Sequence, residues 1–122
     1  MNPQQVINES RPMLKEFLSD IGLYNLESPL DLKSLLEPFS SWVDEQDVTE
    51  DLKFYLASRL AAFICEYLID FYNGERIIKD GRIYMRLPIQ EGLFREFDPY
   101  AVAVEMATDR KNLKEFIDRL LE

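Results

Sequence analysis

The stretch between Thr49 and Asn73 limits the fold more than any other part of this chain. Thr49 is a typical helix N-cap, and Glu50 and Asp51 follow it in the first turn. The apolar residues between the two ends cover nearly the whole circumference at about 100° per residue. The pattern predicts one buried central helix, about 33 Å long, which Gly74 closes in a left-handed conformation.

Three polar side chains of this helix, Arg59, Glu66 and Asp70, fall within about 40° of each other on the helical wheel. Glu66 and Asp70 are like charges four residues apart, so we expect a cation to compensate them, and the arginines of the following hairpin are candidates. One interpretation is a solvated seam on a buried helix. The other is a small polar site, because paired carboxylates can do acid–base or metal chemistry.

The remaining composition excludes several functional classes. The 122 residues are expected to form one domain, 1–122, without a membrane span, because charges interrupt every long apolar run. Cys65 cannot form a disulfide within the chain, and residues 1–10 lack the apolar core of a signal peptide, which together favour the cytoplasm. Histidine is absent, so we expect no Ser–His or Cys–His catalysis, no metal site and no cofactor.

Apolar residues at helical spacing predict covering helices before the central one. One helix is expected from Ser10, as its N-cap, to Gly22. The next is expected to begin at Ser28-Pro29. Pro38 is expected to end or kink it, with a second short helix beyond, because proline lacks the N–H group and clashes one turn back.

After the central helix the hydrophobic period changes from 3.6 to 2, which predicts a hairpin at about 75–87. Its Asp80-Gly81 turn favours type I′ geometry and places Ile78 opposite Ile83. That register directs one face of the second strand into the core and leaves a basic outer face. The core-facing residues are Ile83, Met85 and Leu87, and the outward-facing ones are Lys79, Arg82, Tyr84 and Arg86.

The rest of the chain completes an α+β fold. Pro88 is expected to end the second strand, and a third strand is expected at 93–97. Asp98-Pro99 is a typical helix start, and an amphipathic helix closes the chain. The predicted architecture is therefore N-terminal helices, one long central helix, a small antiparallel sheet and two C-terminal helices.

The formal net charge of −9 is unevenly distributed. The first 74 residues hold 5 basic and 13 acidic side chains, whereas the last 48 hold 9 basic and 10 acidic ones. A basic sheet face that includes a tyrosine could be a nucleic-acid-binding surface. The acidity of the whole chain argues against that interpretation and favours a solvated sheet face. All four glycines lie at element ends, which leaves none for a phosphate-binding loop.

Five acids occur within the eight residues from Asp44 to Asp51, beside Trp42. One interpretation is a docking site for a basic protein, with Trp42 as anchor and Asp44, Glu45 and Asp47 as its charged neighbours. The other is that Trp42 packs on the central helix and the acids are solvated.

The order of Tyr67-Leu68-Ile69-Asp70, a hairpin, Phe97-Asp98-Pro99-Tyr100 and an amphipathic C-terminal helix resembles a group of small bacterial α+β proteins. In those, the central helix carries Tyr-Leu-Gly-Glu, and an Asn/Asp-Pro-Phe segment follows the hairpin. Some of them are associated with polymorphic-toxin immunity. The resemblance covers roughly residues 55–120, with Ile69-Asp70 in place of Gly-Glu and without the tryptophan expected in the hairpin. It implies a non-enzymatic role.

Together these observations predict an acidic, cytoplasmic, non-catalytic binding protein of the immunity or adaptor type, which acts on a protein partner. The alternative is a small-ligand-binding protein or enzyme that uses Arg59, Glu66 and Asp70. A homo-oligomer is a further alternative, because small helical proteins often bury a spare apolar face against a second copy.

Overall fold

The computed structural model describes residues 3–109 and 111–120. The elements of this part confirm the predicted α+β fold and its element order. In chain order they are α1 (Pro3–Asn8), α2 (Ser10–Asp20), α3 (Leu32–Asp44), α4 (Glu50–Tyr72), β1 (Glu75–Lys79), β2 (Arg82–Gln90), β3 (Leu93–Phe97), α5 (Pro99–Asp109) and α6 (Leu113–Leu120).

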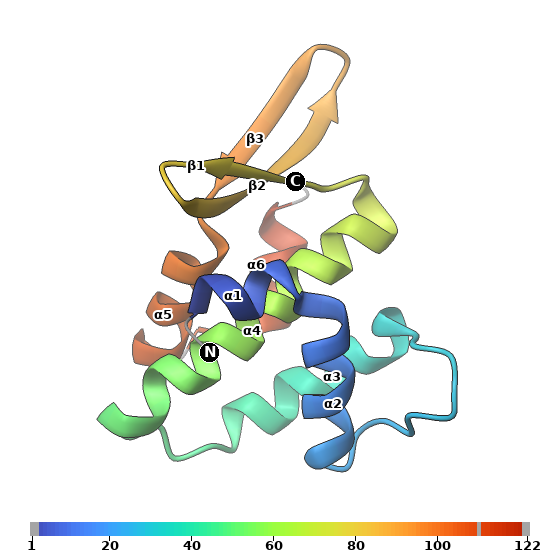
Figure 1. The fold of residues 1–122 in the computed structure, drawn as a ribbon, viewed down its shortest axis with the longest axis vertical. Coiled ribbons are helices and arrows are strands. Elements are labelled where there is room, and N and C mark those ends of the chain that lie inside the picture. Colours follow the sequence, from blue (N-terminus) through green and yellow to red (C-terminus); the bar gives the residue numbers. More distant parts are fainter. Residues whose placement is uncertain (1–2, 110, 121–122) are drawn as a thin grey trace.

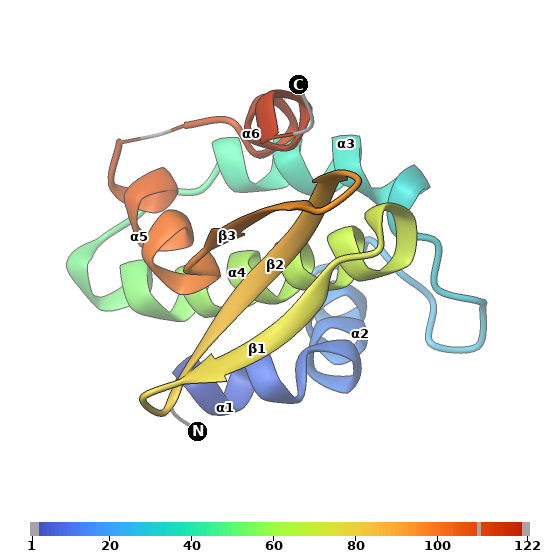
Figure 2. The same ribbon diagram turned by 90° about the horizontal axis from the view of Figure 1, so that it is seen from above.

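Helix α4 runs through the middle of the molecule (Figure 1). Helices α1, α2 and α5 pack directly against it, and α3 and α6 pack against each other on the side opposite α1 and α2 (Figure 2). The sheet lies across one end of this helical layer. Almost every residue from Leu56 to Leu68 is buried, which confirms that α4 is the core of the fold. Within the described residues, no helix is long and apolar enough to cross a membrane.

The start of α4 is capped as predicted, whereas its end is not. Thr49 Oγ1 accepts a hydrogen bond from the N–H of Leu52 at 3.3 Å. At the other end Asn73, with a φ of 57°, takes the left-handed position that was expected of Gly74. Gly74 is needed for a different reason: a Cβ there would lie 3.0 Å from the backbone of Leu68 and 2.9 Å from the methyl group of Met85. The hairpin therefore turns back on α4 too closely for a side chain.

The hairpin has the predicted register, with Ile78 opposite Ile83 and Lys79 opposite Arg82. Asp80 and Gly81 have φ values of 53° and 75°, as a type I′ turn requires. The side chains of Ile83, Met85 and Leu87 are buried, so the predicted core face is confirmed.

The third strand at 93–97 is also confirmed, and it makes β2 the central strand of a three-stranded antiparallel sheet. The prediction that Pro88 ends β2 is wrong, since the strand continues to Gln90. An irregularity in the register between Pro88 and Gln90 accommodates the missing N–H group there.

Two further predictions about the N-terminal helices are wrong. Asp31, not Ser28, caps α3, because its carboxylate accepts the N–H groups of Lys33 and Ser34 at 3.2 and 3.4 Å. Pro38 neither ends nor splits the 13-residue helix α3. Pro38 is exposed, so the backbone hydrogen bond that it cannot donate is lost on the solvent side of the helix. The apolar residues before and after it in α3 are buried, and their packing keeps the helix continuous.

The close approach at Gly74 can be tested by substitution. We expect Gly74→Ala to lower the free energy of unfolding by about 1–3 kcal/mol, because the added methyl group overlaps Leu68 and Met85. Asn73→Gly is the matched control, and its effect should stay within about 1 kcal/mol, because glycine readily adopts a positive φ. Urea denaturation monitored by circular dichroism measures both. Equal effects of the two substitutions would contradict this account.

Candidate functional site

The carboxylates of Glu66 and Asp70 on α4 face two arginines from other elements. Arg11 of α2 donates from its Nε to Glu66 Oε1 at 2.7 Å and pairs through Nη2 with Asp70. Arg76 of β1 lies 3.5 Å from Glu66 Oε2, which also accepts the Ser10 hydroxyl at 2.7 Å. We call these five residues the Glu66 cluster. An arginine of the hairpin, Arg76, therefore compensates Glu66 as expected, whereas Asp70 is paired with Arg11 of α2.

Glu66 is only 2% exposed, and both of its oxygens have partners. Arg76 also donates to the carbonyl oxygens of Ile7 and Asn8, at 3.0 and 2.9 Å, and so binds the end of α1. The hydrogen bonds that Arg11 donates to the carboxylates of Asp70 and Glu66 raise the pKa of its guanidinium above the usual value, against the opposing effect of burial. The cluster therefore ties α1, α2 and β1 to the C-terminal half of α4.

Sequence reasoning missed Arg11 and assigned Ser10 to a different role. The side chain of Ser10 is expected to cap α2, but Glu9 holds the N-cap position and the Ser10 hydroxyl binds Glu66 instead. These partners lie 55 and 56 residues from Glu66 in the chain. No local spacing signals such a pair, because it exists only where α2 crosses α4.

Arg59 does not belong to this cluster, so the predicted seam of three residues is wrong. It lies seven residues before Glu66, which is about 10 Å along the helix axis although the two share a face. Its guanidinium stacks 3.9 Å from the centre of the Tyr55 ring, and its Nη1 donates to Ser58 Oγ at 2.8 Å. Its Nε is buried without a partner in the described structure. The helical wheel alone ignores this separation along the axis.

Replacing Glu66 tests the structural role of the cluster. Glu66→Gln should lower the free energy of unfolding by about 2–3 kcal/mol, because it leaves two arginines without a buried counter-charge. This expected loss of unfolding free energy is smaller than the loss from breaking a fully buried ion pair, because both arginines reach solvent. Asp70→Asn, at the exposed edge of the same cluster, should cost no more than about 1 kcal/mol. Chemical denaturation measures the free energy of unfolding of both variants. Equal losses of stability would contradict the larger structural role of Glu66.

Cys65 lies next to Glu66 and is completely buried. Burial, opposed in part by the charge of Arg76, raises the pKa of its thiol far above the usual value. Because the thiolate is the reactive form, the complete burial of Cys65 and the raised pKa of its thiol both favour a structural role over a reactive one.

Thiol labelling checks this directly. In native buffer Cys65 should react with an aromatic disulfide reagent at least about a thousandfold more slowly than an exposed cysteine, because reaction requires unfolding of α4. The added thiol of a Leu26→Cys variant is the internal reference, since Leu26 is 58% exposed in the segment between α2 and α3. Equal rates for both thiols would show that α4 opens locally.

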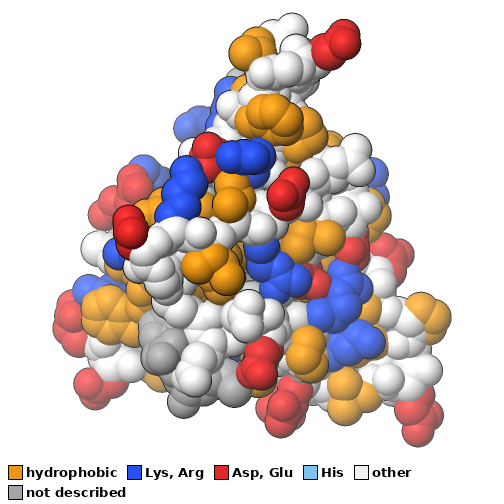
Figure 3. Space-filling model, turned by 45° about the horizontal axis from the view of Figure 1, so that its top comes forward, with side chains coloured by type: hydrophobic (Ala, Val, Ile, Leu, Met, Phe, Trp, Pro, Cys, Tyr) orange, Lys and Arg blue, Asp and Glu red, His pale blue; other side chains and the backbone are white. Residues whose placement is uncertain are grey.

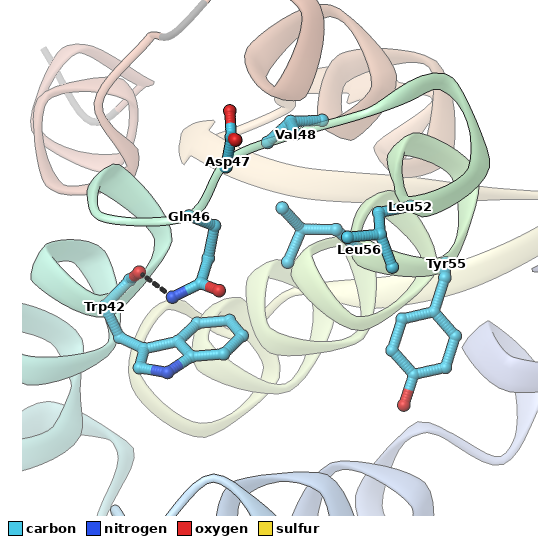
Figure 4. A pocket seen from close by; sticks show the side chains of 7 residues that line it. All are labelled: Trp42, Gln46, Asp47, Val48, Leu52, Tyr55 and Leu56. Carbon is cyan, nitrogen blue, oxygen red and sulfur yellow. Dashed lines mark hydrogen bonds between the residues drawn. The ribbon is translucent and has the colours of Figure 1, made fainter.

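A second site lies at the start of α4, where the chain between α3 and α4 leaves an apolar hollow of about 80 Å³. In Figure 4 the rings of Trp42 and Tyr55 stand on opposite sides of it, with Leu52 and Leu56 between them. We call it the α4 pocket. Its lining consists of Trp42, Gln46, Asp47, Val48, Leu52, Tyr55 and Leu56.

Trp42 forms a wall of this pocket and does not project from the surface. Its indole stacks on Phe39, with ring centres 6.2 Å apart, and meets the ring of Phe17 edge-on at 5.6 Å. Gln46 donates from its amide to the Trp42 carbonyl at 2.8 Å, which holds the turn after α3 (Figure 4). Trp42 can therefore receive a side chain of a partner, but it cannot insert into one.

The acids beside the pocket are solvated, as one interpretation expected. Asp44, Glu45 and Asp47 are exposed, and we call them the acidic rim. Within the described residues none of the three forms an ion pair, and Asp44 accepts only a hydrogen bond from Asn112 at 2.9 Å. Leu52 and Tyr55, on the other side of the hollow, are half exposed. The result is an open apolar pocket next to three carboxylates that form no ion pair in the part of the chain that the structure describes.

The outer face of the sheet has a different character. Its basic side chains are paired with carboxylates: Lys79 with Glu96 at 2.7 Å, Arg82 with Asp98 at 2.6 Å, and Arg86 with Glu96 at 3.7 Å. A face neutralised in this way offers little free positive charge to a phosphate backbone, which favours the interpretation as a solvated sheet face.

Comparisons with known proteins add no assignment to this geometry. No family model matches the chain, and no curated protein or solved structure matches it either. Among the described residues, no group of three or more Cys, Asp or Glu side chains could hold a metal ion.

Proposed function

We propose that this protein is a non-catalytic binding protein of the immunity or adaptor type, which binds a basic partner protein at the α4 pocket. The observation that carries the proposal is the combination of an open apolar pocket with an acidic rim that forms no ion pair in the described structure. In a stable domain, an exposed apolar hollow beside uncompensated charge is typical of a contact surface.

The chemistry of the site defines the partner. An apolar side chain of the partner enters between Trp42 and Tyr55, and lysine or arginine side chains beside it meet the acidic rim. The net charge of −9 attracts a basic protein over a distance, and the rim orients it on arrival. Trp42 lines the pocket that receives the apolar residue of the partner. The sequence alone suggests instead that Trp42 is the anchor that inserts into the partner.

Two further elements of the proposal concern the compartment and the origin of the protein. The buried, free Cys65 suits a reducing compartment, so we propose a cytoplasmic location. The order of central helix, hairpin and Asp98-Pro99 supports a bacterial protein of the immunity-associated group through resemblance. The alternative of a catalytic carboxylate site is less favoured, because Arg11, Arg76 and Ser10 already occupy the oxygens of Glu66.

The acidic rim can be neutralised without altering the fold. The partner is first captured from the native host on immobilised protein, identified by mass spectrometry and purified. We expect the variant Asp44→Asn/Glu45→Gln/Asp47→Asn to associate with it about tenfold more slowly, and the dependence of its association rate on salt to be flatter. Surface plasmon resonance at several salt concentrations measures both quantities.

The control removes three charges elsewhere. Glu27→Gln/Glu37→Gln/Asp80→Asn changes the net charge by the same amount at exposed positions outside the α4 pocket. This variant should keep most of the association rate. Leu52→Lys, within the pocket, should instead accelerate dissociation. If the rim variant and the control behaved alike, the acidic rim would not be the contact surface.

A further inference from the structure

Helix α2 packs against α4 with the opposite chain direction. Near the start of α2, Arg11 pairs with Glu66 and Asp70 of α4. Further along α2, the ring of Phe17 meets the ring of Tyr55 edge-on, with ring centres 6.2 Å apart. Opposite charges of the two helices are therefore in direct contact at one end of the interface, and aromatic rings are in contact at the other.

Beside this aromatic contact the two helices leave a hollow of about 190 Å³. We call it the Arg59 pocket. The residues that α2 contributes recur at helical spacing and share one face, and the two from α4 lie one turn apart. Apolar groups and charged groups both line the hollow. The lining consists of Met13, Glu16, Phe17, Asp20, Tyr55 and Arg59.

The guanidinium of Arg59 is fixed in place but has no counter-charge. It stacks 3.9 Å from the centre of the Tyr55 ring, and its Nη1 donates to Ser58 Oγ at 2.8 Å. Among the described residues no carboxylate forms an ion pair with it, and its buried Nε has no acceptor. Such an unsatisfied donor costs stability and is rare in native proteins. A half-buried, preorganised cation of this kind is suited to an anionic group that enters the pocket.

The opposite wall carries two carboxylates, Glu16 and Asp20, which are exposed. In the part of the chain that the structure describes, neither of them forms an ion pair. Elsewhere on the molecule opposite charges are often in contact, and Figure 3 shows basic side chains next to acidic ones on one face. In the Arg59 pocket, by contrast, opposite charges line the same hollow without pairing.

This arrangement defines the charge of a suitable ligand. A simple anion would be repelled by Glu16 and Asp20 and by the net charge of −9. A simple cation would leave Arg59 without a counter-charge and would be repelled by it. A molecule with both charges satisfies both walls through charge-assisted hydrogen bonds. The volume of about 190 Å³ lies below the range of about 300–1,000 Å³ that is typical of sites for drug-sized ligands, so the ligand is small.

We propose that the Arg59 pocket binds a free α-amino acid as its zwitterion. The carboxylate of the ligand binds the guanidinium of Arg59, and its ammonium group faces Glu16 and Asp20. Its side chain lies against the apolar groups of Met13 and Phe17. The site is distinct from the α4 pocket, although the ring of Tyr55 lines both. Binding of an amino acid is measured without the partner protein, so this proposal and the proposed function can fail independently.

Titration of the ¹⁵N-labelled protein with each standard L-amino acid tests the proposal by NMR spectroscopy. At least one of them should shift the amide signals around Phe17 and Arg59 with a dissociation constant of about 1 mM or lower. The tightest ligand is then compared with its N-acetyl derivative, which lacks the ammonium group, and its amide, which lacks the carboxylate. Each should bind at least about tenfold more weakly. An absence of shifts up to about 10 mM, or an equal affinity of either derivative, would overturn the proposal.

Substitutions on both walls locate the site. Arg59→Gln and the double variant Glu16→Gln/Asp20→Asn should each weaken binding of the same amino acid by at least about tenfold. The double variant changes exposed positions, so it decides the matter even where Arg59→Gln lowers stability.

The matched controls change the same charges at exposed positions outside the pocket. They are Arg119→Gln in α6 and the double variant Glu27→Gln/Glu37→Gln. Both should bind the amino acid as the unmodified protein does. Unchanged binding in the pocket variants, or an equal loss in the controls, would show that the amino acid binds elsewhere and that the assignment is wrong.

Discussion

The structure depends on one buried carboxylate, Glu66, in the C-terminal half of its central helix. Glu66 is held by Ser10 and Arg11 of α2 and by Arg76 of β1, so α2 and β1 meet α4 at one side chain. A buried charge is costly unless its partners are in place. The arrangement therefore favours a single placement of the N-terminal helices and the hairpin on α4. Arg76 extends this tie to the carbonyl groups that end α1.

With the C-terminal half of α4 occupied in this way, the exposed features lie towards other parts of the fold. The start of α4 and the turn after α3 form the α4 pocket with its acidic rim. The sheet at the far end carries an outer face whose basic side chains are paired, and three exposed apolar residues, Ile89, Leu93 and Phe94. The two surfaces lie on different parts of the fold, with the buried part of α4 between them.

Local signals predicted a large part of this fold. The caps around Thr49, the Asp80-Gly81 turn and the alternation in the hairpin defined α4 and the strand register, because each depends on neighbouring residues only. The errors arose where tertiary contacts outweighed a local preference. Pro38 stays within α3 because the apolar face on both sides of it is buried, and Gly74 is required by the nearby backbone of Leu68, not by its own φ. Arg59 was grouped with Glu66 because a helical wheel contains no distance along the axis.

The sequence by itself determined the elements, the buried character of α4, the acidic segment beside Trp42 and the surplus negative charge of the first 74 residues. These properties follow from composition and short-range periodicity. Only the tertiary structure decided that Arg11 and Ser10 meet Glu66, that Trp42 forms a wall and not a projecting anchor, and that Leu93 and Phe94 stay exposed. The physical reason is that burial and ion pairing depend on how helices cross and where a sheet ends. Those distances are set by the packing of the whole chain.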